Sequence, residues 1–292
     1  MTIRETLAGG SAELAAAGIE SPGLDASLLL AEVLSISRSS LTAVSSDAIP
    51  EESIEKFFNL IKRRLAGECT AYLTGKKEFY GLEFNVNPSV LVPRPETETL
   101  VEETLKQAEI KNKHIRILDL CTGSGAIAVA IKHELPETEV WAADISAEAL
   151  AVAETNAARL LPPESIHFCS GNLFESLLSF SCTPFNFIVS NPPYIPTSEI
   201  ANLSPEVRNE PLLALDGGSD GLEIIKNIIS RSPDYLCPGG TLLLEADPRQ
   251  MEGIASLYEK SGFTEVTVYR DLGGRERVIR GKISIQMAYR TV

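Results

Sequence analysis

From residue 115 onward the chain alternates short apolar runs with helical patterns, and this alternation constrains the possible folds more than any other feature. The apolar runs span 115–120, 140–143, 166–169, 185–190 and 241–246, and helices are predicted between them at 125–134, 146–160, 221–235 and 248–261. Strands that alternate with helices are typical of a parallel sheet covered by helices on both faces. We therefore predict an α/β protein with a doubly wound sheet.

Two more extended stretches, 264–269 and 277–285, complete the predicted sheet. They are joined through the sequence Asp271-Leu272-Gly273-Gly274-Arg275. A Gly-Gly pair between two extended stretches predicts a β-hairpin. The last strand is therefore expected to run antiparallel to its neighbour.

Residues 1–75 are predicted to be helical. In the stretch 50–67 the apolar residues Ile54, Phe57 and Ile61 recur at intervals of three or four residues, which indicates an amphipathic helix. Residues 77–86 instead alternate around Gly81, which predicts a β-hairpin. We expect a helical domain at 1–75, a β-hairpin linker at 76–92 and the sheet domain at 93–292. Nothing in 1–75 is typical of catalysis, so we expect this domain to recognise a substrate.

The charge and composition of the chain argue against several classes of function. The chain carries 26 Lys and Arg residues against 40 Asp and Glu, whereas phosphate backbones are bound by basic surfaces. No segment approaches the ~20 apolar residues of a membrane span. The five cysteines include no Cys-x-x-Cys pair, which argues against a zinc site or a disulfide scaffold. We expect a cytoplasmic monomer with no metal, no membrane contact and no nucleic-acid partner.

The first predicted strand of the sheet runs into a glycine-containing loop, Cys121-Thr122-Gly123-Ser124-Gly125. The glycines let a ligand approach the backbone closely, and the amino end of the following helix favours a negative group. The loop lacks the third glycine of the dinucleotide fingerprint, so a single carboxylate would suit it as well as a pyrophosphate. A tight strand-to-helix turn with no ligand is the alternative interpretation.

Polar residues stand at the ends of neighbouring predicted strands. Asp144 closes the second strand, where it could bind both hydroxyls of a ribose or serve as a helix cap. Asn172 follows the third strand and could bind an adenine edge, with Leu173 beside the ring. Asp119, at the end of the first strand, could bind an ammonium group. Together these residues outline a pocket for a ligand with a nucleoside at one end and an amino acid at the other, which describes S-adenosylmethionine.

The fourth predicted strand ends at Asn191-Pro192-Pro193-Tyr194. The two prolines fix the backbone. The side-chain oxygen of Asn191 and the backbone carbonyl of Pro192 are two acceptors beside the ring of Tyr194, and such an arrangement suits a planar NH2 group. A stiff exit from the strand, with a tyrosine on the surface, is the alternative, because a short motif needs its structural context.

Four motifs together resemble those of the peptide chain release factor glutamine N5-methyltransferases, which are class I S-adenosylmethionine-dependent enzymes. They are Val-Pro-Arg-Pro-Glu-Thr-Glu at 92–98, Ile-Val-Ser-Asn-Pro-Pro-Tyr-Ile at 188–195, Glu210-Pro211 with Asp-Gly-Gly-Ser-Asp-Gly-Leu at 216–222, and Asp-Leu-Gly-Gly-Arg-Glu-Arg at 271–277. The resemblance implies a Rossmann-like, seven-stranded methyltransferase sheet. It also implies methylation of the glutamine in the Gly-Gly-Gln motif of release factors, with S-adenosylmethionine as the methyl donor.

The same resemblance implies roles for particular residues. The implied catalytic residues are Asn191, Pro192 and Tyr194. The implied substrate-binding residues are Asn191, Pro192, Pro193, Tyr194, Pro93 and Arg94. The implied cofactor-binding residues are Asp119, Cys121, Thr122, Gly123, Ser124, Gly125, Asp144, Asn172, Leu173 and Asn191. The chain departs from the family pattern at Cys121, where glycine is expected, at Asn172, where aspartate is common, and at 246–247, where an expected glycine is missing.

Two other classes of protein compete with this interpretation. A DNA adenine-N6 methyltransferase uses the same turn on an exocyclic NH2 group, but it needs a basic groove for a flipped base, and this chain is acidic. A nicotinamide dehydrogenase or a nucleoside-binding regulator would not need Asn-Pro-Pro-Tyr, and the missing third glycine argues against both. We expect no dedicated general base, and catalysis mainly by orientation and electrostatics.

Overall fold

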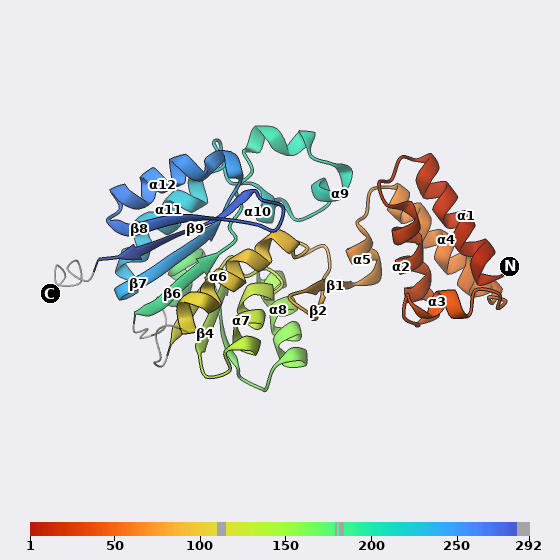
Figure 1. Ribbon diagram of the computed structural model, residues 1–292, viewed down its shortest axis with the longest axis horizontal. Coiled ribbons are helices and arrows are strands. Elements are labelled where there is room, and N and C mark those ends of the chain that lie inside the picture. The colour runs from red at the N-terminus through yellow and green to blue at the C-terminus, as the bar shows by residue number, and fades with distance from the viewer. Residues whose placement is uncertain (110–114, 179, 181–183, 285–292) are drawn as a thin grey trace. The chain divides into compact units, whose positions relative to one another are not determined.

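The computed structural model describes residues 1–109, 115–178, 180 and 184–284. The chain divides into two compact units (Figure 1). The first contains Met1–Lys76 together with Ser204–Asn209, and the second contains Lys77–Leu203 and Glu210–Val292. Each unit has a hydrophobic core of its own.

The first unit is helical. Its helices are α1 (Ile3–Ala16), α2 (Pro22–Leu34), α3 (Ser40–Ala43), α4 (Glu51–Leu65), α5 (Thr70–Thr74) and, from the later segment, α9 (Pro205–Arg208). The helix predicted over 50–67 is α4, and its Phe57 and Ile61 are fully buried in the core of the unit.

A buried arginine explains why residues 204–209 belong to the helical unit. The Arg64 side chain in α4 is 5% exposed, and its Nε donates to Asp25 Oδ2 at 2.7 Å. The same guanidinium pairs with Glu206 in α9. Farther along the segment, Asn209 Nδ2 donates to the Gly67 carbonyl at 2.8 Å. A buried cation needs such compensation, because an unpaired charge in the interior is costly.

The hairpin that follows is formed by β1 (Lys76–Phe79) and β2 (Leu82–Asn85). Tyr80 and Gly81 both have positive φ, at 52° and 71°, as a two-residue type I′ turn requires. Phe79 and Phe84 are buried and pack edge to face, with ring centroids 6.1 Å apart.

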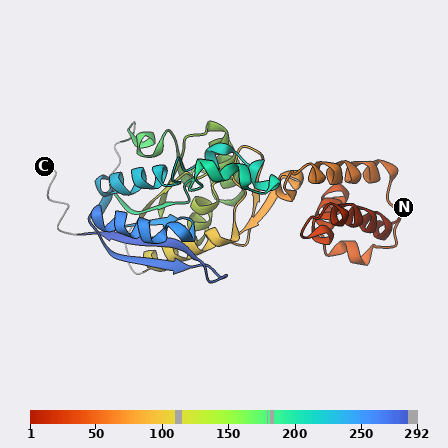
Figure 2. The same cartoon turned by 90° about the horizontal axis from the view of Figure 1, so that it is seen from above.

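The second unit is built on a seven-stranded sheet with the order β5-β4-β3-β6-β7-β9-β8. Its strands are β3 (Arg116–Leu120), β4 (Glu139–Asp144), β5 (Ile166–Ser170), β6 (Phe185–Ser190), β7 (Leu236–Glu245), β8 (Phe263–Arg270) and β9 (Glu276–Ile283). Neighbouring strands from β5 to β7 are parallel, whereas β9 runs antiparallel to both β7 and β8 (Figures 1 and 2). The predicted doubly wound sheet with an antiparallel last strand is confirmed.

Helices cover both faces of this sheet. α6 (Glu98–Glu109), α7 (Ala126–Glu134) and α8 (Ala147–Leu160) share one core with alternate strand residues such as Ile117 and Phe187. α11 (Glu223–Arg231) and α12 (Met251–Lys260) share the other core with Leu118 and Ile188. The strand residues are therefore buried on both sides, as expected for parallel strands.

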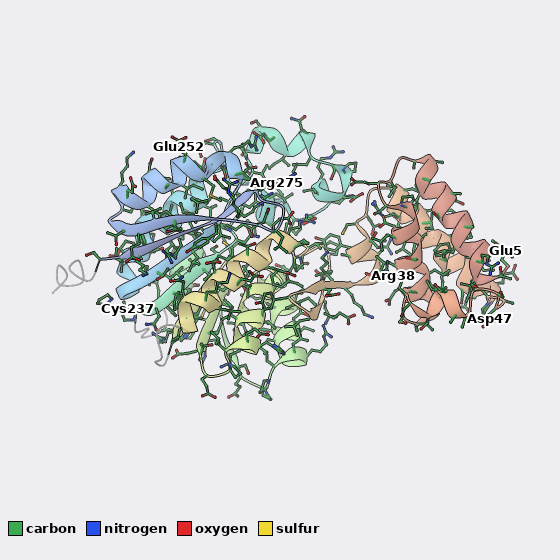
Figure 3. The ribbon with its side chains drawn as sticks, viewed as in Figure 1. Glu5, Arg38, Asp47, Cys237, Glu252 and Arg275 are labelled. Atoms are coloured by element: carbon green, nitrogen blue, oxygen red, sulfur yellow. The ribbon has the colours of Figure 1, made fainter. Side chains whose placement is uncertain are left out.

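Most observed strand boundaries lie within one residue of the predicted ones, and the largest departure is at the start of β7. β7 begins at Leu236, five residues before the predicted start at 241, because its pairing with β6 shifts register between Phe185 and Phe187 and absorbs the Pro-Gly-Gly sequence at 238–240. A Cβ at Gly240 would lie 2.7 Å from the Cys237 carbonyl oxygen, so this irregularity needs glycine. Figure 3 shows Cys237 near the start of β7. The predicted strand end at residue 285 lies outside the described residues.

The long connection between β6 and α11 contains short helices that the sequence pattern did not predict. They are η3 (Thr197–Asn202), α9 and α10 (Leu212–Leu215). Other single turns precede or follow the main helices: η1 (Pro95–Thr97), η2 (Leu173–Leu177), η4 (Ser232–Asp234) and η5 (Pro248–Gln250). Among the described residues, no helix has both the length and the apolar character needed to span a bilayer.

Candidate active site

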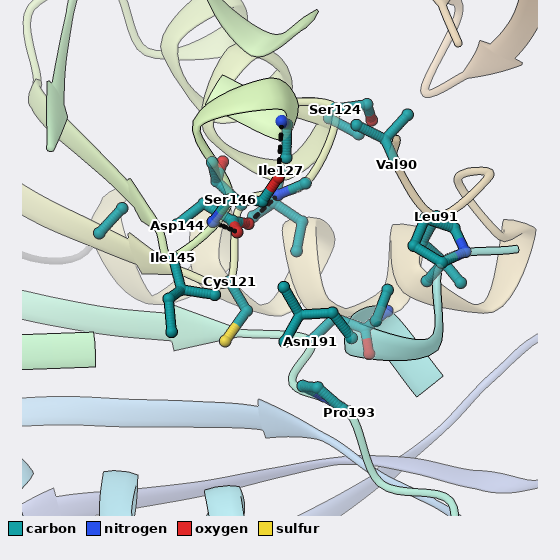
Figure 4. Close-up of a pocket in the computed structure, with 18 of the residues that line it drawn as sticks. Val90, Leu91, Cys121, Ser124, Ile127, Asp144, Ile145, Ser146, Asn191 and Pro193 are labelled. Atoms are coloured by element: carbon teal, nitrogen blue, oxygen red, sulfur yellow. Dashed lines mark hydrogen bonds between the residues drawn. The ribbon is translucent and has the colours of Figure 1, made fainter. Parts of the chain in front are cut away.

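A pocket in the second unit lies where the carboxyl ends of the parallel strands meet (Figure 4). Its wall includes loops that follow four neighbouring strands, β3, β4, β5 and β6. The predicted site residues that line it are Pro93, Arg94, Cys121, Thr122, Gly123, Ser124, Asp144, Asn172, Leu173, Asn191 and Pro193. The structure thus brings together residues that are up to 100 positions apart in the chain (193 − 93 = 100).

Four predicted site residues do not line this pocket. Asp119 is fully buried behind it. Gly125 is the residue before α7 and has φ +79°, and a Cβ there would lie 3.0 Å from the Ala153 Cβ of α8. Gly125 therefore serves the close packing of two helices. Pro192 and Tyr194 are the neighbours of Pro193, which lines the pocket. Their predicted roles are contacts with the substrate glutamine.

The glycine loop is shaped by left-handed backbone conformations. Cys121 has φ +58° and Gly123 has φ +55°. A residue with a Cβ costs roughly 1–2 kcal/mol in this region, which is the physical reason why glycine would be favoured at 121. The loop keeps the left-handed conformation despite this departure from the family pattern, and Thr122 N donates to the Ala143 carbonyl at 3.0 Å.

Asp144, at the end of β4, holds the glycine loop and the start of α8 together. Its Oδ2 accepts from Gly123 N at 2.9 Å, and its Oδ1 accepts from Ser146 N at 2.9 Å (Figure 4). The capping residue of α8 is Ser146, whose Oγ accepts from Ala149 N at 3.0 Å. Burial raises the pKa of Asp144. Each carboxylate oxygen has more than one acceptor position, so both can still accept a hydroxyl from the pocket.

Asp119 is a carboxyl group in the interior beside the pocket wall. Its Oδ2 accepts from the Thr122 hydroxyl at 2.6 Å. Among the described residues its Oδ1 has no hydrogen bond of normal geometry, although the Ala128 backbone lies close enough to lower the pKa of the carboxyl group. Burial raises the pKa of Asp119 to about 7, although the bond from Thr122 lowers it. A buried carboxyl group with an unsatisfied oxygen is destabilising unless something compensates it, and a bound cation would do so.

We expect the replacement of Asp119 by asparagine to change how stability depends on pH. The folded-state pKa of about 7 lies above the ordinary value of 3.8. The stability contributed by the bound proton is therefore complete below about pH 4 and is lost as the pH rises through about 7. Asparagine still accepts from Thr122 and cannot ionise. The variant should gain stability over the wild type as the pH rises across this window, by on the order of 2–4 kcal/mol.

Urea unfolding at about pH 4 and about pH 8 measures this difference. Asp234→Asn is a matched control, because Asp234 is exposed. An Asp119→Asn stability difference that is equal at both pH values would show that the pKa of the Asp119 carboxyl group is not raised in the folded protein.

Asn191, directly after β6, lies across the pocket from Ser124 and Asp144 (Figure 4). Its Nδ2 donates to the Thr97 hydroxyl oxygen at 3.2 Å. This bond leaves the side-chain oxygen of Asn191 available to accept from a ligand. Thr97 itself lines the pocket, and sequence reasoning did not identify it, although it belongs to the family-like motif at 92–98.

A buried glutamate holds the Pro-Arg-Pro loop, which is formed by residues 93–95. Arg94 pairs with Glu210, whose side chain is 1% exposed. Glu210 also accepts from Val92 N at 3.3 Å. Burial raises the pKa of Glu210, and the charge of Arg94 opposes that shift. Pro211, the next residue, lines the pocket, so this ion pair ties two pocket walls together.

Gln250 supports the turn that follows Asn191. Its Nε2 donates to the Tyr194 carbonyl at 2.9 Å and to the Gly221 carbonyl at 3.4 Å. Its Oε1 accepts from Asp247 N at 3.3 Å, and Asp247 in turn caps η5. The departure from the family pattern at 246–247 thus forms a capping box that fixes Gln250. Sequence reasoning gave Gln250 no role.

Comparison with known proteins identifies relatives of this chain. The family model described as "PrmC N-terminal domain" matches residues 5–75, and the one described as "Methyltransferase small domain" matches residues 96–204. A release factor glutamine methyltransferase of Deinococcus radiodurans is 39% identical over 282 residues, which cover 97% of this chain and 99% of the relative. A protein of the same name from Geobacter sulfurreducens is 39% identical over 283 residues, with 97% of each chain covered.

A solved structure shares the fold. The methyltransferase from Pyrococcus furiosus superposes with a TM-score of 0.52 at 19% sequence identity, and the match covers 78% of this chain and 99% of that one. At this level of identity the likeness concerns the fold alone.

Proposed function

This chain belongs to the release factor glutamine methyltransferase family, and from that premise we propose that it methylates the glutamine of the Gly-Gly-Gln motif in peptide chain release factors. The observation that carries the proposal is the bond from Asn191 Nδ2 to Thr97, which leaves an amide oxygen available in the pocket. An acceptor held on a rigid Asn-Pro-Pro-Tyr turn suits the NH2 group of a glutamine.

We propose S-adenosylmethionine as the methyl donor, and the pocket residues fit it. Asp144 offers two carboxylate oxygens at the end of β4 for ribose hydroxyls. The loop at 121–125 brings the backbone to the pocket without bulky side chains, and Asp119 behind it has an unsatisfied oxygen. Asn172 and Leu173 would contact the adenine. When bound, the cofactor supplies an electrophilic methyl group on a sulfonium.

The residues of the Asn-Pro-Pro-Tyr turn would act by orientation. A glutamine nitrogen is a weak nucleophile, because its lone pair is delocalised into the carbonyl. Hydrogen bonds from its two N–H groups to Asn191 Oδ1 and to the Pro192 carbonyl would position the nitrogen and raise its electron density. Tyr194 would pack on the amide plane, and Pro93 and Arg94 would form a wall for the substrate. Such orientation accounts for catalysis without a dedicated base.

We also propose that the helical domain at 1–75 helps to bind the release factor, with the hairpin at 76–92 as the linker. The absence of catalytic residue patterns from this domain supports the idea. We propose that the protein acts as a monomer. The cysteine pattern supports a reducing, cytoplasmic environment.

Mass spectrometry tests the proposed function. A bacterial release factor is incubated with this protein and labelled S-adenosylmethionine, and its Gly-Gly-Gln peptide is analysed. We expect one methyl group on the glutamine, and none when that glutamine is replaced by alanine. A methyl mark on DNA, with none on the glutamine, would overturn the proposal in favour of an adenine methyltransferase.

A further inference from the structure

A line of polar side chains connects the Asn191 amide to a buried carboxylate. Asn191 Nδ2 donates to the Thr97 hydroxyl oxygen at 3.2 Å. The carboxyl group of Glu245 lies close enough to the Thr97 side chain for the two to interact, and this interaction lowers the pKa of Glu245. Thr97 is 4% exposed and Glu245 is 1% exposed. The three residues come from separate parts of the second unit: the exit of β6, the turn η1 and the last position of β7.

The donor and acceptor capacities of Glu245, Thr97 and Asn191 determine which group donates each hydrogen bond in this line. An ionised carboxylate can only accept hydrogen bonds, whereas a hydroxyl carries a single proton that it can donate. If Thr97 donates its proton to Glu245, its oxygen can only accept from Asn191. The amide of Asn191 must then present Nδ2 to Thr97 and turn its oxygen the other way.

We propose that Thr97 and Glu245 are positioning residues that hold the Asn191 amide with its oxygen toward the substrate. This inference rests on the proposed function. The two orientations of an asparagine amide have nearly the same shape, and only their hydrogen bonds distinguish them. With the amide reversed, an NH2 group would face the NH2 group of the glutamine, and no hydrogen bond could form between them. The line of bonds thus selects the orientation that binds a donor.

Burial works against the ionised form of Glu245 that this arrangement requires, and neighbouring groups offset part of that effect. Burial raises the pKa of Glu245 to about 7, whereas the interaction with Thr97 and the charges of Arg277 in β9 and Arg94 lower it. The charge of Glu96 acts in the opposite direction. Glu245 Oε2 has no hydrogen-bond partner among the described residues. A buried carboxylate with an unsatisfied oxygen destabilises the folded protein. A role in orienting Asn191 would explain why the protein has a glutamate at this position.

Two pairs of variants test the inference by separating hydrogen bonding from shape. Thr97→Val keeps the shape but removes the hydroxyl, whereas Thr97→Ser keeps the hydroxyl. Glu245→Leu cannot accept a hydrogen bond, whereas Glu245→Gln can. The kcat for release factor methylation should fall about 10- to 100-fold in Thr97→Val and Glu245→Leu, because the amide is no longer held in one orientation. Thr97→Ser and Glu245→Gln should restore most of that loss.

Two further readouts distinguish positioning from a structural role. Calorimetry should give the same cofactor Kd for all four variants, and urea midpoints identify any variant that is poorly folded. The wild-type kcat should rise with pH through about 7, because protonated Glu245 can donate its own proton to Thr97, and Thr97 is then free to donate to Asn191 and hold the amide in the reversed orientation. This rise should be absent in Glu245→Gln. Equal kcat values within each pair, or a rise with pH that persists in Glu245→Gln, would overturn the inference.

A measurement on the protein alone keeps the inference testable if the release factor proves not to be the substrate. In protein labelled with 15N-asparagine, the side-chain NH2 signals of Asn191 are assigned by their loss in Asn191→Asp. Their chemical shifts and hydrogen exchange should change in Thr97→Val and return toward wild type in Thr97→Ser. Unmethylated glutamine with this NMR pattern would refute the proposed function alone. Signals of Asn191 that are the same in all variants would refute the positioning role.

Discussion

Replacing Asn191 by alanine is expected to abolish methyl transfer while it leaves the affinity for S-adenosylmethionine within a few-fold of wild type. The variant loses the acceptor that would hold the glutamine NH2 group, and the hydroxyl oxygen of Thr97 loses the donor that it has in the folded protein. Removal of one such oriented group costs about 10²–10³ in kcat in other enzymes. Asn191 lines the pocket at the side opposite Asp144 (Figure 4), so the ribose and the glycine loop keep their contacts.

Turnover is measured by transfer of labelled methyl groups to a release factor, and cofactor affinity by calorimetry. Asn202→Ala is a matched control, because Asn202 is an exposed residue of η3 that does not line the pocket. Loss of cofactor binding together with activity would show that Asn191 is a cofactor or structural residue instead.

Replacing Asp144 by alanine is expected to weaken cofactor binding by about 100-fold or more. The change removes the proposed acceptor for two ribose hydroxyls, and a hydrogen bond to a charged group contributes roughly 1.5–3 kcal/mol. It also leaves Gly123 N and Ser146 N without the carboxylate that binds both. The glycine loop should therefore lose its alignment with α8, which adds to the loss of affinity.

Calorimetric titration with S-adenosylmethionine measures the effect, and Asp144→Asn should show a smaller one because it retains an acceptor. Asp234→Ala, at an exposed position in η4 outside the pocket, provides the control. If Asp144→Ala bound the cofactor as tightly as this control, the nucleoside would have to lie elsewhere in the pocket.

The main elements of the second unit could be predicted because their residue patterns have a clear period and clear boundaries. β6 spans Phe185–Ser190, as predicted, since the two prolines that follow cannot continue a ladder. β7 is the opposite case, because Pro-Gly-Gly normally marks a turn and only the register shift against Phe185 and Phe187 brings 236–240 into the strand. The short helices between β6 and α11 have too few residues to show a period.

The site residues that could be predicted from the sequence are those that directly follow a strand, because the end of a parallel strand has a fixed place in the sheet. Residues that end parallel strands meet at one edge of the sheet, which is why Asp144, Asn172 and Asn191 could be assigned to one pocket before the structure was known. Asp119 shows the limit of that argument. Its position in the sequence placed it at the edge, whereas its burial and its bond to Thr122 place it behind the pocket wall.

The sequence by itself determined the alternation of strands and helices, the residues at the strand ends and the motifs of the family. Only the tertiary structure decided which polar groups bind one another: Asn191 with Thr97, 94 positions apart, Arg94 with Glu210, 116 apart, and the Gln250 side chain with the Tyr194 backbone carbonyl, 56 apart. A hydrogen bond needs a donor and an acceptor about 3 Å apart in a suitable direction. That geometry depends on the paths of loops from separate elements, and no local period in the sequence records those paths.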